Sequence, residues 1–200
     1  RGIAMNDSGI YALFADHKST LKECSGDNSD GSTIKFMTES QIEAVNFDKF
    51  KTKYTNDLRL SEECAASADA LLQTDTGLAF VEFKNGKVNN RNVKDKIRDS
   101  LLLFCDFTQK TISYTREHVD FIVVYNEEKN PLPNQYKKQT NADAPSRTEI
   151  SRYFLGKGNQ ELILFDLERY QHLYFREVHT YTKEQFGNYI EKTLSGGPVS

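Results

Sequence analysis

Residues 78–84 have the sequence Leu-Ala-Phe-Val-Glu-Phe-Lys, a short apolar run that ends in a carboxylate and an ammonium group. Successive side chains of a β-strand point to opposite faces. The even-numbered residues of this run therefore share one face and the odd-numbered residues share the other. Charged groups are almost never fully buried unless they are paired or bound to a metal. We therefore expect Glu82 and Lys84 to line a cleft at the rim of a sheet.

A turn sequence precedes this strand. Asp75-Thr76-Gly77 separates it from another apolar run at 67–74. Two short runs around a glycine-containing turn predict a β-hairpin. The midpoint between Asp69 and Glu82 falls inside the turn, so the hairpin brings these two carboxylates level with each other.

The rest of the chain alternates between helical and strand patterns. Apolar residues at helical spacing predict helices over 38–54, 92–107, 147–155 and 182–194. Continuous apolar runs predict buried strands over 119–125 and 161–167. Turn residues predict loops at 23–32 and 130–145. This order predicts an α/β fold with a mixed central sheet flanked by helices.

The composition is that of a globular protein. The chain has 200 residues with 38% hydrophobic and 28% charged residues, which excludes a disordered chain. Its length suits a single domain, which we expect over residues 5–195. Met5 indicates that residues 1–4 are a cloning remnant, and Ser-Gly-Gly-Pro near the end predicts a loose tail over 196–200.

Charge and cysteine content narrow the functional classes. The formal net charge of −3 excludes binding of a polyanion by bulk charge, so a nucleic acid would need a local basic patch. The three cysteines, Cys24, Cys64 and Cys105, have no CxxC spacing and indicate neither a disulfide framework nor a zinc site. No stretch approaches the roughly 18 apolar residues of a membrane span. We expect a cytoplasmic protein with no membrane association.

Two carboxylates placed side by side repel each other unless a cation lies between them. A hard divalent cation such as Mg²⁺ takes oxygen ligands, commonly one or two carboxylates with waters and substrate phosphates. Such an ion lowers the pKa of a bound water and stabilises charge in phosphoryl transfer. A neighbouring lysine can orient the water or neutralise developing charge. Asp69, Glu82 and Lys84 are therefore the candidate catalytic residues, with Mg²⁺ or Mn²⁺ as the cofactor.

Asp69, twelve intervening residues and Glu82-Phe83-Lys84 together resemble the Asp…Glu-x-Lys signature of the PD-(D/E)xK nuclease superfamily. The resemblance covers roughly residues 38–126 and implies a restriction-endonuclease-like core. It also implies a metal-dependent nuclease or endonuclease that hydrolyses phosphodiester bonds of DNA or RNA. Ala68 stands where the signature has proline, and the following helix lacks the glutamine of exonuclease-like branches. The subfamily therefore stays open.

The resemblance also implies a further acid from the helix that precedes the hairpin. Glu43 shares the inward face of the predicted helix with Phe47 and Phe50, so the metal ligands would be Asp69, Glu82 and Glu43. Rival acids stand nearby at Glu39, Glu62 and Glu63.

A basic patch follows the strand. Residues 82–98 carry a net charge of +4 in a chain of net charge −3. A phosphate backbone that passes the site would be attracted to such a patch, although a solvated helix face explains the same charges. The candidate nucleic-acid contacts are Lys87, Arg91, Lys94 and Arg98.

Two other hypotheses stay open because the motif is short. One is a catalytically inactive module on the same fold that binds nucleic acid or protein. The other is an interaction or immunity-type protein in which the motif occurs by chance. The choice between DNA and RNA is also open, as are a homodimer and an inhibitory protein partner.

Overall fold

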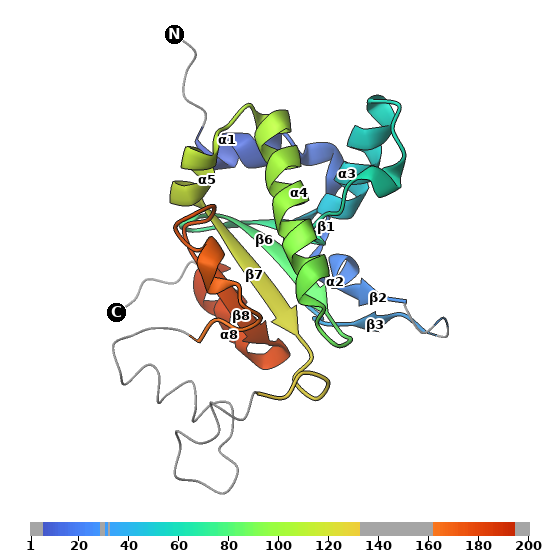
Figure 1. Ribbon diagram of the computed structural model, residues 1–200, viewed down its shortest axis with the longest axis vertical. Helices are drawn as coiled ribbons and strands as arrows, with labels where there is room; N and C mark the ends of the chain where they lie inside the picture. The colour runs from blue at the N-terminus through green and yellow to red at the C-terminus, as the bar shows by residue number, and fades with distance from the viewer. Residues whose placement is uncertain (1–5, 29–30, 32, 133–161, 195–200) are drawn as a thin grey trace, which may run out of the picture.

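The computed structural model describes residues 6–28, 31, 33–132 and 162–194. A six-stranded sheet forms the centre of this part of the molecule (Figure 1). Its strands, in the spatial order β1-β4-β5-β6-β7-β8, are Lys18–Thr20, Glu43–Asn46, Ala70–Thr74, Gly77–Lys84, Val119–Tyr125 and Val178–Thr182. A separate two-stranded ribbon pairs β2 (Gly26–Asp27) with β3 (Lys35–Phe36).

The direction of pairing changes at β6. Strands β1, β4, β5 and β6 pair antiparallel, whereas β6, β7 and β8 pair parallel. Parallel neighbours need a crossover connection of a dozen or more residues. Helices α4 (Asn90–Thr108) and α5 (Ile112–His118) provide it between β6 and β7. The predicted α/β class, with a mixed sheet flanked by helices, is confirmed.

The other helical segments are shorter than α4, and the longest of them, α3 (Phe47–Asp57) and α8 (Lys183–Leu194), lie on opposite faces of the sheet. The remaining ones are α1 (Asp7–Ala12) and α2 (Leu21–Cys24), with 3₁₀ turns at Ala15–His17, Glu62–Cys64 and Glu168–Tyr170. Among the described residues, no helix is long and apolar enough to cross a membrane. The cysteines are free, and Cys105 is half-buried.

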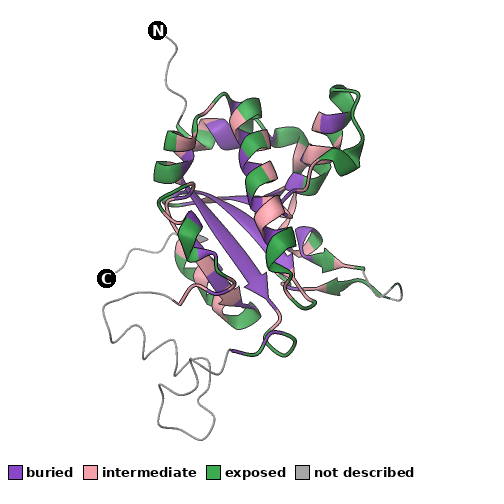
Figure 2. Ribbon diagram, viewed as in Figure 1, coloured by how far each residue is buried: buried purple, intermediate pink, exposed green. Residues whose placement is uncertain are grey.

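Two apolar layers enclose the sheet, whose central strands are buried in Figure 2. Leu78 and Phe80 pack into one layer with residues of α1, α3 and α4. Ala79, Val81 and Phe83 pack into the other layer with residues of α2 and α8. The predicted division of the β6 side chains between two faces is therefore confirmed.

Helix α4 covers the face of β6 that carries Glu82. It begins after Asn89, whose side chain accepts hydrogen bonds from the backbone N–H groups of Arg91 (3.0 Å) and Asn92 (3.2 Å). Such caps satisfy donors that have no partner within the helix. The predicted stripe of apolar residues is buried against the sheet, at Val93, Ile97, Leu101 and Phe104.

The helix predicted over 38–54 is wrong in its first part. Residues Glu43–Asn46 form β4, between β1 and β5, and α3 begins at Phe47. The Asn46 side chain accepts a hydrogen bond from the Lys49 backbone N–H at 2.9 Å and caps α3. Ala44 and Val45 are fully buried in the sheet, and this burial overrides the local helical spacing.

The strand predicted over 161–167 is also wrong for its described residues. Phe165 and Asp166 have φ angles of 63° and 59°, so the backbone turns there. The missed strand is β8, whose sequence Val-His-Thr-Tyr-Thr is rich in β-branched and aromatic residues.

Several expectations concern residues outside the described part. These are the helix at 147–155, most of the loop at 130–145 and the segments 1–4 and 196–200.

The terminal helix α8 is confirmed, with Phe186 and Ile190 buried. Thr182 Oγ1 accepts a hydrogen bond from the Gln185 N–H (3.2 Å), and Gln185 Oε1 accepts one from the Thr182 N–H (2.9 Å). This reciprocal arrangement is a capping box.

The β5–β6 turn depends on glycine. Thr74 pairs with Gly77, whose φ is 149°. A Cβ at Gly77 would lie 2.3 Å from the carbonyl oxygen of His118, the last residue of α5. The turn therefore packs directly against the entry into β7.

We expect Gly77→Ala to lower the free energy of unfolding by about 2–6 kcal/mol, because backbone strain and steric overlap add. Urea unfolding followed by circular dichroism measures the loss. Gly187→Ala is the matched control, because a Cβ there meets no atom within 4 Å and the residue lies within α8. The control should raise stability by up to about 1 kcal/mol. An unchanged Gly77→Ala protein would contradict the tight turn.

Candidate functional site

The β5–β6 hairpin places Asp69 opposite Glu82. The Asp69 backbone N–H donates to the Val81 carbonyl at 3.1 Å, one residue beyond the paired positions Ala70 and Val81. The Asp69 side chain then accepts a hydrogen bond through Oδ2 from the Phe83 backbone N–H at 2.6 Å. The carboxylate of Asp69 is thereby fixed against the end of β6.

Helix α4 holds the segment that leads to Asp69. The backbone N–H of Ala66 donates to Asp99 Oδ2 at 2.8 Å, and that of Ala68 donates to Ser100 Oγ at 2.7 Å. Both acceptors belong to α4. The helix thus fixes the segment that enters β5, and with it the position of Asp69.

Glu82 is fully buried, with a side-chain exposure of 0%. Its Oε1 lies 2.8 Å from Lys84 Nζ and 2.9 Å from Lys96 Nζ. Its Oε2 accepts a hydrogen bond from Lys96 Nζ at 3.0 Å. Removing a carboxylate from water costs several kcal/mol unless such partners compensate.

Lys96 links the two carboxylates. Its ammonium group also lies 3.1 Å from Asp69 Oδ1, and its side chain is 17% exposed. Lys96 follows Val93 by three residues on α4, so it lies beside the buried stripe and reaches the rim of the sheet. Lys96 belongs to the basic stretch 82–98, but no pattern in the sequence assigned it to the site.

Lys84, at the end of β6, is anchored on both sides. Besides its ion pair with Glu82, its Nζ donates a hydrogen bond to Asn92 Oδ1 at 2.9 Å. Asn92 lies in the first turn of α4. Lys84 therefore stands between the strand end and the start of the helix.

Asp48 is the acid that α3 contributes. It lies in the first turn of α3 and accepts a hydrogen bond from the Ser67 hydroxyl through Oδ1. It lines a cavity of about 300 Å³ together with Asp69 and Lys84. An aspartate two residues after an asparagine cap was the available sequence signal, but the predicted helix began too early to place it there.

The acids proposed as further ligands lie elsewhere. The pairing of Val45 with Leu71 places Glu43 four strand residues away from the level of Asp69. Four residues of a β-strand span about 13 Å. Glu43 pairs with Lys18 (2.8 Å) and Glu39 with Lys22 (2.7 Å). The prediction that Glu43 joins Asp69 and Glu82 from the inward face of a helix is therefore wrong.

The other two rival acids belong to the exposed 3₁₀ turn Glu62–Cys64. Glu62 accepts a hydrogen bond there from the Thr52 hydroxyl at 3.2 Å.

The predicted basic patch is partly neutralised. Lys94 pairs with Asp166 at 2.6 Å, and Arg98 pairs with Asp95. Lys87 is exposed on the loop after β6, and Arg91 is exposed in the first turn of α4. Lys87 and Arg91 are therefore better placed than Lys94 and Arg98 to meet a phosphate backbone.

The carboxylate pair offers a cation oxygen atoms from two side chains. The Lys96 ammonium contacts oxygens of both Asp69 and Glu82, so one cation reaches both side chains. Glu82 Oε1 is buried between the ammonium groups of Lys84 (2.8 Å) and Lys96 (2.9 Å), so a metal ion would have to displace one of them to reach this oxygen. The described residues contain no group of three or more His, Cys, Asp and Glu arranged around a metal. Waters or substrate oxygens would complete the shell.

Burial dominates the electrostatics of the site. It raises the pKa of Asp69 to about 7, with a further increase from Glu82 and an opposing effect from Lys96. For Lys96, burial lowers the pKa, but the neighbouring Asp69 and Glu82 more than offset this effect and raise it above the usual value. The Asp69 carboxyl group therefore keeps its proton to a higher pH than the carboxyl group of an ordinary aspartate does.

Comparisons with known proteins identify no relative. No family model, no curated protein and no solved structure matches the chain.

We expect the Asp69 carboxyl to titrate near pH 7 in the metal-free protein, and carboxyl ¹³C NMR measures this. Because the folded-state pKa lies above the ordinary 3.8, the stability that Asp69 contributes is complete below about pH 4 and is lost as pH rises through about 7. Asp69→Asn should remove this fall in stability, and Lys96→Met should raise the Asp69 pKa further. A pKa at or below 4 in the wild type would contradict the burial of Asp69.

Proposed function

We propose that the chain is a divalent-metal-dependent nuclease that hydrolyses phosphodiester bonds of DNA or RNA, with Asp69 and Glu82 as ligands for Mg²⁺ or Mn²⁺. The observation that supports this proposal is the fully buried Glu82, which pairs with Lys84 and shares Lys96 with Asp69. Asp69 and Lys84 in turn line a cavity. Charged groups gathered at such cost are typical of functional sites. The free thiols fit a reducing compartment such as the cytoplasm.

Each side chain of the site would have a distinct role in such a reaction. A bound ion would lower the pKa of a water and stabilise negative charge on the phosphate. Asp69 and Glu82 would hold the ion, and the hydrogen bond from the Phe83 N–H would keep Asp69 oriented. Lys84 would neutralise charge at the reacting phosphate. Lys87 and Arg91 would attract the backbone on either side.

Lys96 would compete with the metal ion for the same oxygens. Its ammonium group contacts Asp69 Oδ1 and both oxygens of Glu82. Affinity for the free ion should therefore be weak until substrate phosphate adds further oxygen ligands. Lys96 would then remain close enough to pair with the phosphate, because its helix is fixed by the buried stripe of α4.

A binding module without catalysis is the second candidate function. The Lys84 and Lys96 ammonium groups already balance the two carboxylates, and the described residues contain no group of three or more His, Cys, Asp and Glu side chains that could hold a metal ion. An ion bridge of this kind can have a purely structural role, in which it holds β5, β6 and α4 together. In that case nucleic acid or protein would bind without any dependence on divalent ions.

We expect calorimetry with Mn²⁺, in the presence of a phosphorothioate oligonucleotide that resists cleavage, to detect binding that Glu82→Gln abolishes. Cleavage of plasmid, single-stranded DNA and RNA by the same variant should fall at least about 100-fold, because removal of a single charge-stabilising group commonly costs this much. Asp57→Asn is the control, since Asp57 is exposed and forms an ion pair with Lys53 of the same helix, α3. Cleavage that persists in Glu82→Gln would exclude this mechanism. Oligonucleotide binding without metal binding would favour the non-catalytic module.

The acid that α3 contributes gives a separate prediction. Asp48→Asn should weaken Mn²⁺ binding, because Asp48 lines the cavity beside Asp69. Glu43→Gln should leave binding unchanged, because Glu43 pairs with Lys18 at the far end of β4. The reverse result in calorimetry would show that the third acid comes from Glu43.

A further inference from the structure

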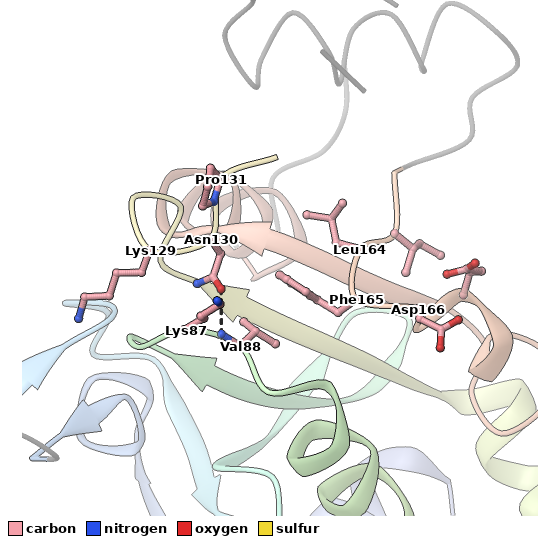
Figure 3. Close-up of a pocket in the computed structure, with 10 residues that line it drawn as sticks. Lys87, Val88, Lys129, Asn130, Pro131, Leu164, Phe165 and Asp166 are labelled. Atoms are coloured by element: carbon pink, nitrogen blue, oxygen red, sulfur yellow. Dashed lines mark hydrogen bonds between the residues drawn. The ribbon is translucent and has the colours of Figure 1, made fainter. Parts of the chain in front are cut away.

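A second cavity lies beside the candidate site, at the carboxyl ends of the parallel strands β6 and β7. It has a volume of about 640 Å³, within the range of small-molecule sites. In Figure 3, Asn130 and Pro131 lie on one side, Leu164 and Phe165 lie on the other, and Lys87 and Val88 lie at the base. Ligands of open α/β sheets bind preferentially at the carboxyl ends of parallel strands.

One loop separates this cavity from the candidate site. Lys84, Asn85 and Gly86 line the cavity that contains Asp69, and the next two residues, Lys87 and Val88, line the second cavity. Five consecutive residues span at most about 14 Å, so the two cavities are neighbours. A single extended ligand is therefore long enough to reach both cavities.

Asn130 fixes this loop. Its Oδ1 accepts a hydrogen bond from the Val88 N–H at 2.8 Å, and its Nδ2 donates to the Gly86 carbonyl at 2.9 Å. The loops that follow β6 and β7 are thus joined through one buried side chain. The cavity between them is preformed rather than created by a ligand.

The cavity presents an aromatic ring on a strained turn. Phe165 and the following Asp166 both have left-handed φ angles, which are unusual for residues other than glycine and destabilise the backbone. Phe165 packs edge-on against Tyr125, with ring centroids 5.2 Å apart. Leu164 and Val88 extend this apolar surface. Strain of this kind is maintained only where the surroundings enforce it, and it is common at ligand sites.

The cavity lining carries charges of both signs. Lys87 and Lys129 are its basic residues, and Asp166 and Glu168 are its acidic residues. Asp166 is itself paired with Lys94 at 2.6 Å and with Arg169 at 2.5 Å. The acidic residues disfavour a phosphate chain in this cavity, whereas the apolar side chains beside Phe165 suit a flat and uncharged heteroaromatic ring.

We propose that this cavity binds one unstacked base of a single-stranded nucleic acid whose phosphate backbone passes Asp69, Glu82 and Lys84. The proposal rests on the proposed function, because base and phosphate belong to the same substrate. Phe165 supplies the stacking surface, and the base lies between it and the loops that carry Val88 and Pro131. A base inside a duplex cannot enter unless it is first unstacked, so the site selects single strands.

The test is binding of a short fluorescein-labelled single-stranded DNA, measured by fluorescence anisotropy without divalent ions. Phe165→Leu keeps an apolar side chain but removes the aromatic face, and it should weaken binding about 5- to 150-fold, the range for one base–aromatic stack. Phe107→Leu is the matched control, because Phe107 is an exposed aromatic residue of α4, remote from the cavity lining. Val88→Trp, which fills the cavity from a half-buried position, should weaken binding similarly and serves if Phe165→Leu fails to fold.

A strand that lacks the base at one position should lose affinity for the wild type but not for Phe165→Leu, and the matching duplex should bind more weakly than the single strand. Equal binding by wild type, Phe165→Leu and Val88→Trp, or a preference for duplex, would overturn the proposal. Loss of cleavage in Glu82→Gln with unchanged binding by Phe165→Leu would refute the base site alone. Absent cleavage and metal binding, with weakened binding by Phe165→Leu, would refute the nuclease and retain the base site.

Discussion

The pairing of the buried Glu82 with Lys84 and Lys96 is the constraint on which the rest of the structure depends. A carboxylate with no solvent exposure is tolerable only if cations reach it, and both cations come from segments that the fold must hold in place. Lys84 ends β6, and Lys96 is carried by the helix that packs across the same face of the sheet. Strand, helix and hairpin are thus coupled through one carboxylate.

This coupling explains why the two cavities lie where they do. Strand β6 is the last antiparallel partner of β5 and the first parallel partner of β7, so the chain must leave its carboxyl end to form a crossover. The loop 84–88 begins that crossover and lines both cavities. The buried polar side chains of Glu82 and Asn130 fix its two ends. The two cavities are therefore neighbours because of the topology.

The candidate site was predictable as far as the hairpin extends. Asp69 and Glu82 are equally far from a glycine-containing turn, and this spacing determines that they lie opposite each other in the hairpin. The alternation of side chains along β6 determines which face of the sheet carries Glu82. Lys96 could not be assigned, because 14 residues and a helix of unknown rotation separate it from Glu82. Asp48 was missed because the start of α3 depends on where β4 ends, which is decided by pairing with β1 and β5.

By itself, the sequence determined the elements whose pattern is local: the β5–β6 hairpin, the buried strand β7, the amphipathic helix α4 and the capped helix α8. It did so because periodicity, turn residues and caps act within a few residues of one another. Only the tertiary structure decided that Glu43–Asn46 is a strand and that 162–167 is not. It also decided that Lys96 lies between two carboxylates and that Phe165 faces a cavity. Each of these outcomes depends on burial against segments distant in the chain, which no local pattern encodes.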